Sequence, residues 1–260
     1  MSNILNQFSM DFFRLDGKVA IVTGGNTGLG QAYAVALAKA GADLVITTHG
    51  NNWNETRELI EQEGRKVVFV QAELSKKEDR HNIIEVTMKE FGKIDVLVNN
   101  AGTIRRAPLL EYKEEDWNAV MDINLNALYF LSQEAAKIMV QQGSGKIINV
   151  ASMLSFQGGK FVPPYTASKH GVAGITKAFA NELACKNIQI NAIAPGYIKT
   201  ANTEPIRADK VRNAEIQGRI PADRWADPFD LMGAIVFLAS KASDYVNGHV
   251  LAVDGGWLVR

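Results

Sequence analysis

Short apolar runs alternate with longer amphipathic stretches along most of the chain. The runs are rich in Val and Ile and lack polar alternation, which is typical of strands buried on both faces. They predict seven strands, at 18–23, 43–48, 66–72, 94–99, 146–151, 189–194 and 249–253. The stretches between them predict helices at 29–40, 53–63, 76–91, 114–141 and 165–184. We therefore expect an α/β fold: a Rossmann-type, doubly wound parallel sheet with helices on both faces.

One segment interrupts this alternation. Residues 200–224 are polar and mixed in charge, and helical apolar spacing resumes only at Leu231. We interpret the segment as a mobile, lid-like excursion over the active site. No linker, low-complexity tract or internal repeat divides the rest, so we expect residues 1–260 to form a single domain.

Charge and composition narrow the possible partners. The 28 Lys and Arg residues balance 28 Asp and Glu residues, so the basic face that nucleic acid requires is not indicated. The single cysteine, Cys185, allows no internal disulfide, and the four histidines lack metal-ligand spacing. No basic residue precedes Arg14, and the longest apolar runs are shorter than the ~20 residues of a membrane span. We expect a cytoplasmic protein with no metal, nucleic-acid or membrane partner.

A glycine-rich turn follows the first predicted strand and opens the first helix. It reads Thr23-Gly24-Gly25-Asn26-Thr27-Gly28-Leu29-Gly30. Glycines allow a tight turn and the close approach of a pyrophosphate, and the helix N-terminus offers free N–H groups to that anion. An ordinary glycine-rich turn is the alternative, but the strand–turn–helix context favours a dinucleotide site.

Tyr165 and Lys169 are four residues apart on a predicted helix and therefore share one face. An ammonium beside a phenol favours the phenolate, so we expect Lys169 to lower the pKa of Tyr165 toward neutrality. Tyr165 could then exchange a proton with a substrate hydroxyl. Alone, the pair would fit a solvated helix face, but Ser152 and the upstream turn favour catalysis.

Further motifs occur in a fixed order: Asn99-Asn100-Ala101-Gly102 after the fourth strand, Asn124 in the long helix, Ser152 after the fifth strand, Tyr165-Thr166-Ala167-Ser168-Lys169, and Pro195-Gly196 after the sixth strand. Together with the Gly-x-x-x-Gly-x-Gly turn, they resemble the short-chain dehydrogenase/reductase family over roughly residues 15–256. The resemblance implies an NAD(P)-dependent oxidoreductase acting on a CH–OH group, assembled as a homotetramer. It implies that Ser152 hydrogen-bonds the reacting oxygen, that Lys169 also holds the nicotinamide ribose and that Asn124 orders a relay water.

The turn and the resemblance together give a set of cofactor-binding residues. These are Gly24, Asn26, Thr27, Gly28, Leu29, Gly30, Thr48, His49, Glu73, Leu74, Asn100, Ala101, Gly102, Tyr165, Lys169, Pro195, Gly196, Ile198 and Thr200. The second strand ends Thr47-Thr48-His49-Gly50, without the carboxylate that binds a ribose 2′-OH and without a basic residue for a 2′-phosphate. Because the glycine-rich turn also lacks Arg and Lys, we predict NAD rather than NADP, with Thr48 or His49 near the ribose. Glu73 takes the place of the family's Asp at the adenine.

Several segments resemble the branch of the family that acts on sugar acids in uronate degradation; they lie at 102–106, 151–159, 219–225 and 242–257. A sugar acid carries a carboxylate, which guanidinium groups bind well. We expect the substrate to contact Arg105, Arg106, Ser152, Gln157 and Arg219, although a surface ion pair is the alternative for each arginine. We expect Trp53, Trp117, Trp225 and Trp257 to be packing elements rather than stacking platforms, and only Trp225, in the lid-like segment, is placed where it could contact substrate.

Three other functions remain open. The chain could be another sugar-acid dehydrogenase, such as a gluconate 5-dehydrogenase. It could also be a 3-oxoacyl reductase, which would need a long apolar channel. A regulatory protein that binds a dinucleotide without turnover is the alternative from a different class, and the intact Ser152, Tyr165 and Lys169 argue against it.

Overall fold

The computed structural model describes residues 7–260, and residues 1–6 lie outside the described residues. Those six belong to the expected single domain and to the stretch before Arg14 that has no basic residue. A seven-stranded, entirely parallel sheet forms its centre. The strands are β1 (Val19–Thr23), β2 (Asp43–Thr48), β3 (Val67–Gln71), β4 (Val96–Asn99), β5 (Gly145–Val150), β6 (Ile188–Pro195) and β7 (Val250–Val253). All seven predicted strands are confirmed, with ends that differ by two residues at most.

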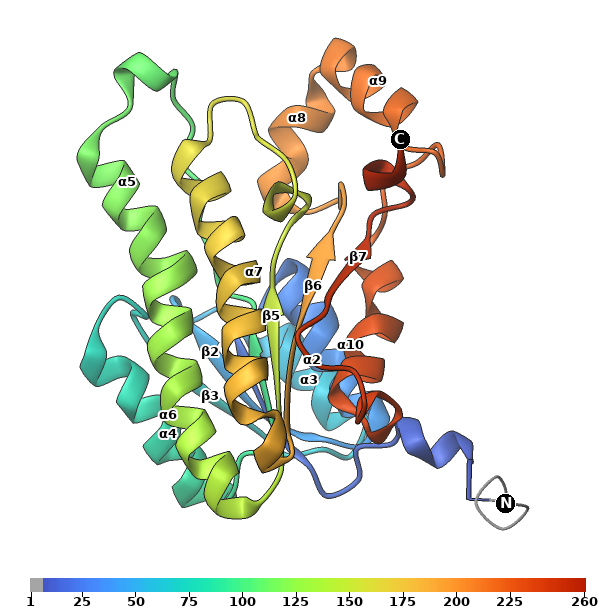
Figure 1. The fold of residues 1–260 in the computed structure, drawn as a ribbon. Coiled ribbons are helices and arrows are strands. Elements are labelled where there is room, and N and C mark those ends of the chain that lie inside the picture. Colours follow the sequence, from blue (N-terminus) through green and yellow to red (C-terminus); the bar gives the residue numbers. More distant parts are fainter. Residues whose placement is uncertain (1–6) are drawn as a thin grey trace.

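Helices cover both faces of the sheet (Figure 1). They are α2 (Gly28–Ala40), α3 (Asn54–Glu61), α4 (Lys77–Phe91), α5 (Glu114–Met121), α6 (Leu128–Gln142), α7 (Pro163–Leu183), α8 (Glu204–Ala208), α9 (Lys210–Arg219) and α10 (Met232–Ala239). Apolar side chains of α2, α3 and α10 pack on one face, and those of α4, α6 and α7 pack on the other. The predicted doubly wound architecture is therefore correct.

The strand order is β3-β2-β1-β4-β5-β6-β7. The chain runs outward from β1 to β3, returns to place β4 beside β1, and then continues in the opposite direction. In open α/β sheets the loops at such a reversal diverge, which leaves a crevice at the carboxyl ends of the strands. This topology brings the turn after β1 and the loop after β4 together at the crevice.

The predicted helix at 114–141 is interrupted. A π-helical segment, Asp122–Ala127, joins α5 to α6, and α6 ends at Gln142. Within the segment, the side chain of Asn124 bonds both backbone groups of Thr103: Oδ1 accepts from its N–H at 2.8 Å, and Nδ2 donates to its carbonyl at 2.9 Å. These contacts fix the loop after β4 against the segment. Periodicity did not reveal the interruption, because apolar spacing is nearly the same on both sides of it.

Residues 200–224 are more regular than the sequence suggested. They contain α8 and α9, which lie above the carboxyl end of the sheet (Figure 1). Asp209 caps α9 by accepting from the N–H groups of Val211 and Arg212, and Ile216 and Ile220 bury the inner side of the segment. Because only a few apolar residues lie on this inner side, the helical spacing of the segment was not recognised from the sequence.

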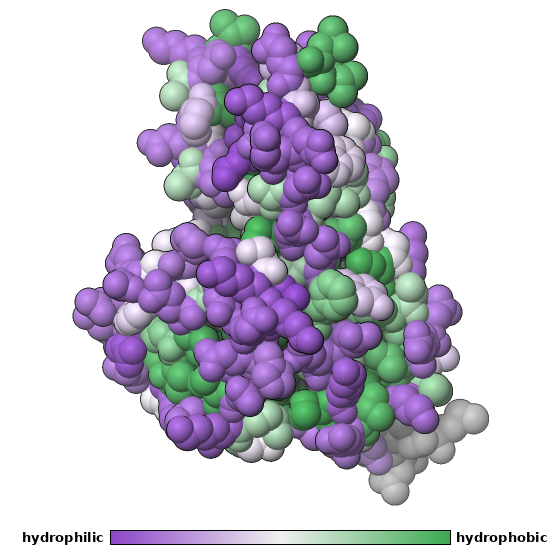
Figure 2. Space-filling model, turned by 90° about the vertical axis from the view of Figure 1, so that its left-hand side faces the viewer, coloured by the Kyte–Doolittle hydropathy of each residue, from purple (hydrophilic) through white to green (hydrophobic). Residues whose placement is uncertain are grey.

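Polar and charged side chains cover most of the face that carries α4, α5 and α6, with apolar ones scattered between them (Figure 2). Within residues 7–260, no helix has the length and apolar character needed to cross a membrane.

Candidate active site

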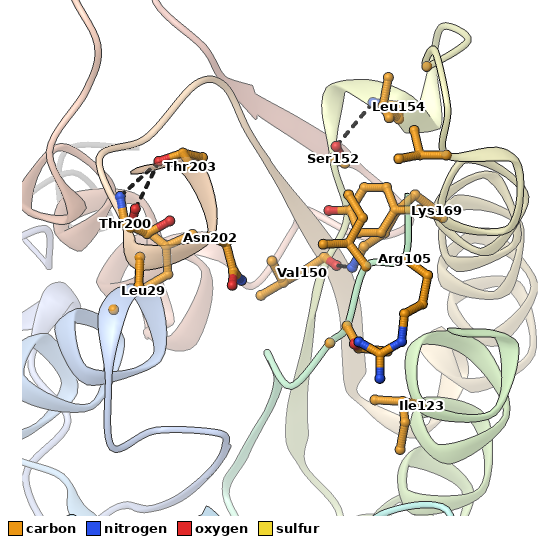
Figure 3. A pocket seen from close by; sticks show the side chains of 18 of the residues that line it. Leu29, Arg105, Ile123, Val150, Ser152, Leu154, Lys169, Thr200, Asn202 and Thr203 are labelled. Carbon is orange, nitrogen blue, oxygen red and sulfur yellow. Dashed lines mark hydrogen bonds between the residues drawn. The ribbon is translucent and has the colours of Figure 1, made fainter. Parts of the chain in front are cut away.

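A cavity of about 1580 Å³ opens at the carboxyl end of the sheet. The loops after strands β1 to β6, together with α8, α9 and the C-terminal segment, line it. Figure 3 shows Leu29, Thr200 and Asn202 on one side of the cavity and Ser152, Lys169 and Arg105 on the other. Ordinary small-molecule sites occupy about 300–1,000 Å³, so this cavity has room for a dinucleotide and a small substrate together.

Most of the predicted site residues line this cavity; three do not. Ile198 is buried and lies in the bridge to Ala226. Pro195 is the last residue of β6 and pairs with Val253. Asn124 is buried beneath the loop after β4, where its amide contacts Thr103 and, at 3.2 Å, the hydroxyl of Ser168. Its contacts therefore indicate a positioning residue for that loop rather than a side chain that faces the cavity.

The glycine-rich turn fits a dinucleotide. Gly24 has a φ of 60°, and a Cβ on Gly30 would lie 2.1 Å from the carbonyl oxygen of Gly24 and 2.5 Å from Nδ2 of Asn100. Thr27 precedes α2 without a side-chain capping bond, so the first N–H groups of the helix have no side-chain partner there. Uncapped N–H groups at a helix N-terminus are well placed to bind a pyrophosphate.

Two threonines that were not predicted, Thr23 and Thr47, hold this turn in place together with Asn100. The Thr23 hydroxyl accepts from the N–H groups of Asn100 and Ala101, both at 3.0 Å. The Asn100 amide in turn donates to the carbonyls of Thr23 and Gly24, and the Thr47 hydroxyl accepts from the Gly24 N–H. The ends of β1, β2 and β4 are thereby tied together. Thr23 is the last residue of β1 and Thr47 the last but one of β2, and hydroxyl residues at the ends of buried strands are the signal that could have identified them.

The loop after β2 forms the end of the cavity expected to hold the adenosine. His49 is largely exposed, and its Nδ1 lies 3.4 Å from Oε2 of Glu73. The Thr48 hydroxyl donates to the Gly50 carbonyl at 2.6 Å and so shapes the loop. Both Thr48 and His49 line the cavity as predicted. Glu73 places a carboxylate at this end.

Tyr165 and Lys169 lie side by side near the start of α7, with the ammonium 5.5 Å from the centre of the phenol ring. The expectation that Lys169 lowers the pKa of Tyr165 toward neutrality was nevertheless wrong for the protein without cofactor. Burial raises the pKa of Tyr165, and the Ser152 hydroxyl and the Arg106 guanidinium lower it to a lesser degree. Lys169 is itself buried, donates to the Val150 carbonyl at 2.6 Å, and has its pKa lowered to about 8 by desolvation. Desolvation of both groups therefore outweighs their proximity.

The lowered pKa of Lys169 predicts a stability change with pH. Because the amine has its usual value of 10.5 in the unfolded chain and about 8 in the folded protein, the unfolded chain holds more protons between these values. The free energy of unfolding should therefore rise by about 1–3 kcal/mol from pH 8 toward pH 10.5, relative to Lys169→Met. Urea unfolding of both proteins at several pH values measures this difference.

The matched control is Lys177→Met, an exposed lysine on the same helix. Its unfolding free energy should follow the wild-type pH dependence. Parallel curves for wild type and Lys169→Met would instead show that the amine titrates normally in the folded protein.

Ser152 follows β5, and its Oγ accepts from the Leu154 N–H at 3.1 Å (Figure 3). The Ser152 hydroxyl thus already accepts one hydrogen bond from its own loop. It also lies close enough to Tyr165 to lower the pKa of the phenol. Both hydroxyls line the same cavity. The pair can hydrogen-bond a single substrate oxygen from two directions.

The predicted substrate arginines differ in their surroundings. Arg105 lies 3.5 Å from Asp116. Arg106 lines the cavity close enough for its charge to act on Tyr165. Arg219, on α9, reaches Oε1 of Gln157 at 3.5 Å and stacks on the ring of Trp257. All three and Gln157 line the cavity.

Several residues that were not predicted also line the cavity, among them Tyr197, Arg212 and Trp257. Trp225, expected to pack and the only tryptophan placed where it could contact substrate, is buried under α9, where its Nε1 donates to Asn213. Arg212 lies seven residues before Arg219, a spacing that places both on one helix face. Because Arg219 was predicted to contact substrate, this spacing could have identified Arg212 as a second candidate.

Known proteins resemble the chain over almost its whole length. The family model described as enoyl-(acyl carrier protein) reductase matches residues 24–258. The 2-dehydro-3-deoxy-D-gluconate 5-dehydrogenases of Escherichia coli and Bacillus subtilis are 57% and 56% identical to it; the matches cover 95% and 96% of this chain, respectively, and 98% of each relative. A solved structure from Agrobacterium tumefaciens, provisionally named 2-deoxy-D-gluconate 3-dehydrogenase and containing NADP, is 52% identical with a TM-score of 0.89, covering 95% of this chain and 99% of that one.

These matches agree with the fold and with the order of the motifs. The strand order, the glycine-rich turn after β1 and the Ser152, Tyr165 and Lys169 side chains around one cavity occur together in this chain. The chain belongs to the short-chain dehydrogenase/reductase family.

Proposed function

We propose that the protein is an NAD-dependent oxidoreductase that interconverts 2-dehydro-3-deoxy-D-gluconate and 2,5-didehydro-3-deoxy-D-gluconate by hydride transfer at C5. The observation that carries the proposal is the placement of Tyr165, Lys169 and Ser152 in the cavity that the dinucleotide turn also lines. The names of relatives more than half identical to the chain support the sugar-acid substrate. The arginines of the cavity give that anion a complementary charge.

The bound nicotinamide would supply the hydride acceptor or donor. Tyr165 moves the proton at the substrate oxygen, and Ser152 hydrogen-bonds the same oxygen and orients it. Lys169, held by the Val150 carbonyl, contributes positive charge beside the phenol and binds the ribose. In its oxidised form the nicotinamide would also bring a positive charge near the phenol, which opposes the effect of burial on the pKa of Tyr165.

Several features support NAD over NADP. Glu73 and the exposed His49 occupy the loops at the adenosine end, and the residues lining the cavity there include no Arg or Lys. A 2′-phosphate would lie near the Glu73 carboxylate without a guanidinium or ammonium to neutralise it. The Agrobacterium structure contains NADP, so cofactor choice needs a direct measurement.

We expect the purified protein to oxidise 2-dehydro-3-deoxy-D-gluconate with NAD and to reduce the 2,5-diketo product with NADH. The kcat/KM should be about tenfold or more higher for NADH than for NADPH, because the unpaired phosphate would lose more than 1 kcal/mol. Absorbance of the reduced nicotinamide follows both reactions.

The control substrates are D-gluconate with NAD and 5-keto-D-gluconate with NADH, which test the gluconate 5-dehydrogenase alternative. A higher kcat/KM on this pair would reassign the substrate, and a clear preference for NADPH would reverse the choice of cofactor. The 3-oxoacyl reductase alternative is less well supported, because Arg105, Arg106 and Arg219 line the cavity where an acyl chain would need apolar walls. Turnover of any sugar acid would rule out a non-catalytic regulator.

Family membership also supports three broader proposals: a single domain, a homotetramer and a cytoplasmic location. Light scattering and cell fractionation address the latter two.

A further inference from the structure

One wall of the cavity is built from α9 and the C-terminal segment, which lie together at the top of the molecule (Figure 1). Four side chains meet there: Tyr197, Arg212, Arg219 and Trp257, all of which line the cavity. The segment is held against α9 by a hydrogen bond from Arg260 to the Gly218 carbonyl at 2.8 Å. We call these four residues the α9 wall.

Aromatic rings fix the position of Arg219 in the α9 wall. Its guanidinium carbon lies 4.0 Å from the centre of the Trp257 ring, and the Tyr197 ring packs edge-on against the same ring at 4.7 Å. Such stacking uses the flat face of a guanidinium and leaves its N–H edge free to donate. One donor of that edge reaches Gln157 across the cavity at 3.5 Å.

Arg212 brings a second positive charge to the same place. It lies two helical turns before Arg219 on α9, so both side chains leave the same face. Both guanidiniums lower the pKa of Tyr197, which burial raises, so both lie close enough for their charges to act on its hydroxyl. Two guanidiniums and a phenol therefore converge on one part of the cavity.

The two arginines of the α9 wall, Arg212 and Arg219, carry their charge outside any ion pair of residues 7–260. Of the two carboxylates of this region that line the cavity, Asp209 caps α9 and Glu215 has no cationic partner within the same part of the chain. Trp257 is 5% exposed, so its ring forms a fixed surface under the guanidinium of Arg219. Two unpaired guanidiniums that line one part of the cavity indicate that an anionic ligand completes this wall.

The other two arginines are less suited to that anion. Arg105 already contacts Asp116, and the charge of Arg106 acts on Tyr165 at the reacting end of the cavity. We propose that the substrate carboxylate binds the α9 wall between Arg212 and Arg219, with the Tyr197 hydroxyl as a further donor and Trp257 as the surface that positions Arg219. The proposal rests on the proposed function and assigns the carboxylate a subsite away from Arg105 and Arg106.

The test compares 2-dehydro-3-deoxy-D-gluconate, called the acid below, with its primary amide. The amide has the same shape without the charge. Arg212→Met and Arg219→Met should each weaken binding of the acid by about tenfold, because each removes a charge-assisted hydrogen bond. Binding of the amide should change little. Fluorescence titration of the NADH-loaded protein gives both dissociation constants without turnover, and KM values for the acid should rise in parallel.

Lys210→Met is the matched control, because Lys210 is an exposed cation on α9 that does not line the cavity. Its dissociation constants should equal those of wild type, and those for NADH should stay constant in every variant. Tyr197→Phe should weaken binding of the acid by a smaller factor. Arg106→Met should reduce kcat for acid and amide alike.

Equal losses for acid and amide in Arg212→Met and Arg219→Met would overturn the subsite. So would an acid-selective loss in Arg106→Met with normal binding in both α9 variants. If wild type binds the sugar acid through the α9 wall and transfers no hydride, the proposed function fails while the subsite stands.

Discussion

Tyr165→Phe is expected to reduce turnover by about 10²–10⁴-fold, the usual contribution of a positioned proton donor. The phenol is the group in the cavity that can give the substrate oxygen its proton, with Ser152 beside it and Lys169 5.5 Å from its ring. Removal of one oxygen leaves the ring and its packing in place. Turnover should therefore fall while the dissociation constant for NADH stays the same, and steady-state kinetics with a fluorescence titration measures both.

The control is Tyr245→Phe, which removes a hydroxyl from a fully exposed side chain. Its kinetics should match wild type. If Tyr165→Phe kept near-normal turnover, the proton would have to come from another group in the cavity.

Gly30→Ala should weaken NADH binding by about 100-fold or more. The new Cβ would lie 2.1 Å from the Gly24 carbonyl oxygen and 2.5 Å from Nδ2 of Asn100, and the first of these atoms belongs to the backbone of the turn itself. The turn must shift to relieve the overlap, which displaces the N–H groups of α2 that we propose bind the pyrophosphate. Loss of two or more charge-assisted hydrogen bonds corresponds to about 3 kcal/mol. Fluorescence titration with NADH measures the loss.

Gly233→Ala is the matched control. Gly233 lies in α10, and beyond the backbone of its own helix a Cβ added there would meet no atom of residues 7–260 within 4 Å. Alanine in a helix should raise stability by about 0.5–1 kcal/mol relative to glycine. Circular dichroism should show that both variants remain folded. Normal NADH binding by Gly30→Ala would mean that the turn can accommodate the new Cβ without displacing its N–H groups, contrary to the contacts of Gly30.

Much of the fold could be predicted because its strands are buried on both faces. Continuous Val and Ile runs such as Val19–Thr23 differ sharply from the helices around them. The site followed from the same pattern, since parallel strands end at one edge and bring Gly24, Asn100 and Ser152 together. The π-helical segment at Asp122–Ala127 was not predictable, because it depends on contacts of Asn124 with Thr103 in a distant loop.

The pKa shifts of Tyr165 and Lys169 and the composition of the α9 wall could not be predicted from the sequence for a different reason. The i, i+4 spacing placed Lys169 beside Tyr165 correctly, but the depth of burial that lowers the pKa of one and raises that of the other depends on the surrounding packing. Tyr197 and Trp257 come from segments 60 residues apart that only the fold brings to α9. Their aromatic character alone did not distinguish a cavity wall from core.

The most direct test of the proposed function is to follow one hydrogen. NADH carrying deuterium at the transferring position of C4 should deliver it to C5 of 2,5-didehydro-3-deoxy-D-gluconate, and NMR of the product locates the label. We expect deuterium at C5 of the 2-dehydro-3-deoxy-D-gluconate formed by wild type, and no label in the product of Tyr165→Phe over the same time. Label at another carbon, or no transfer to this substrate, would contradict it.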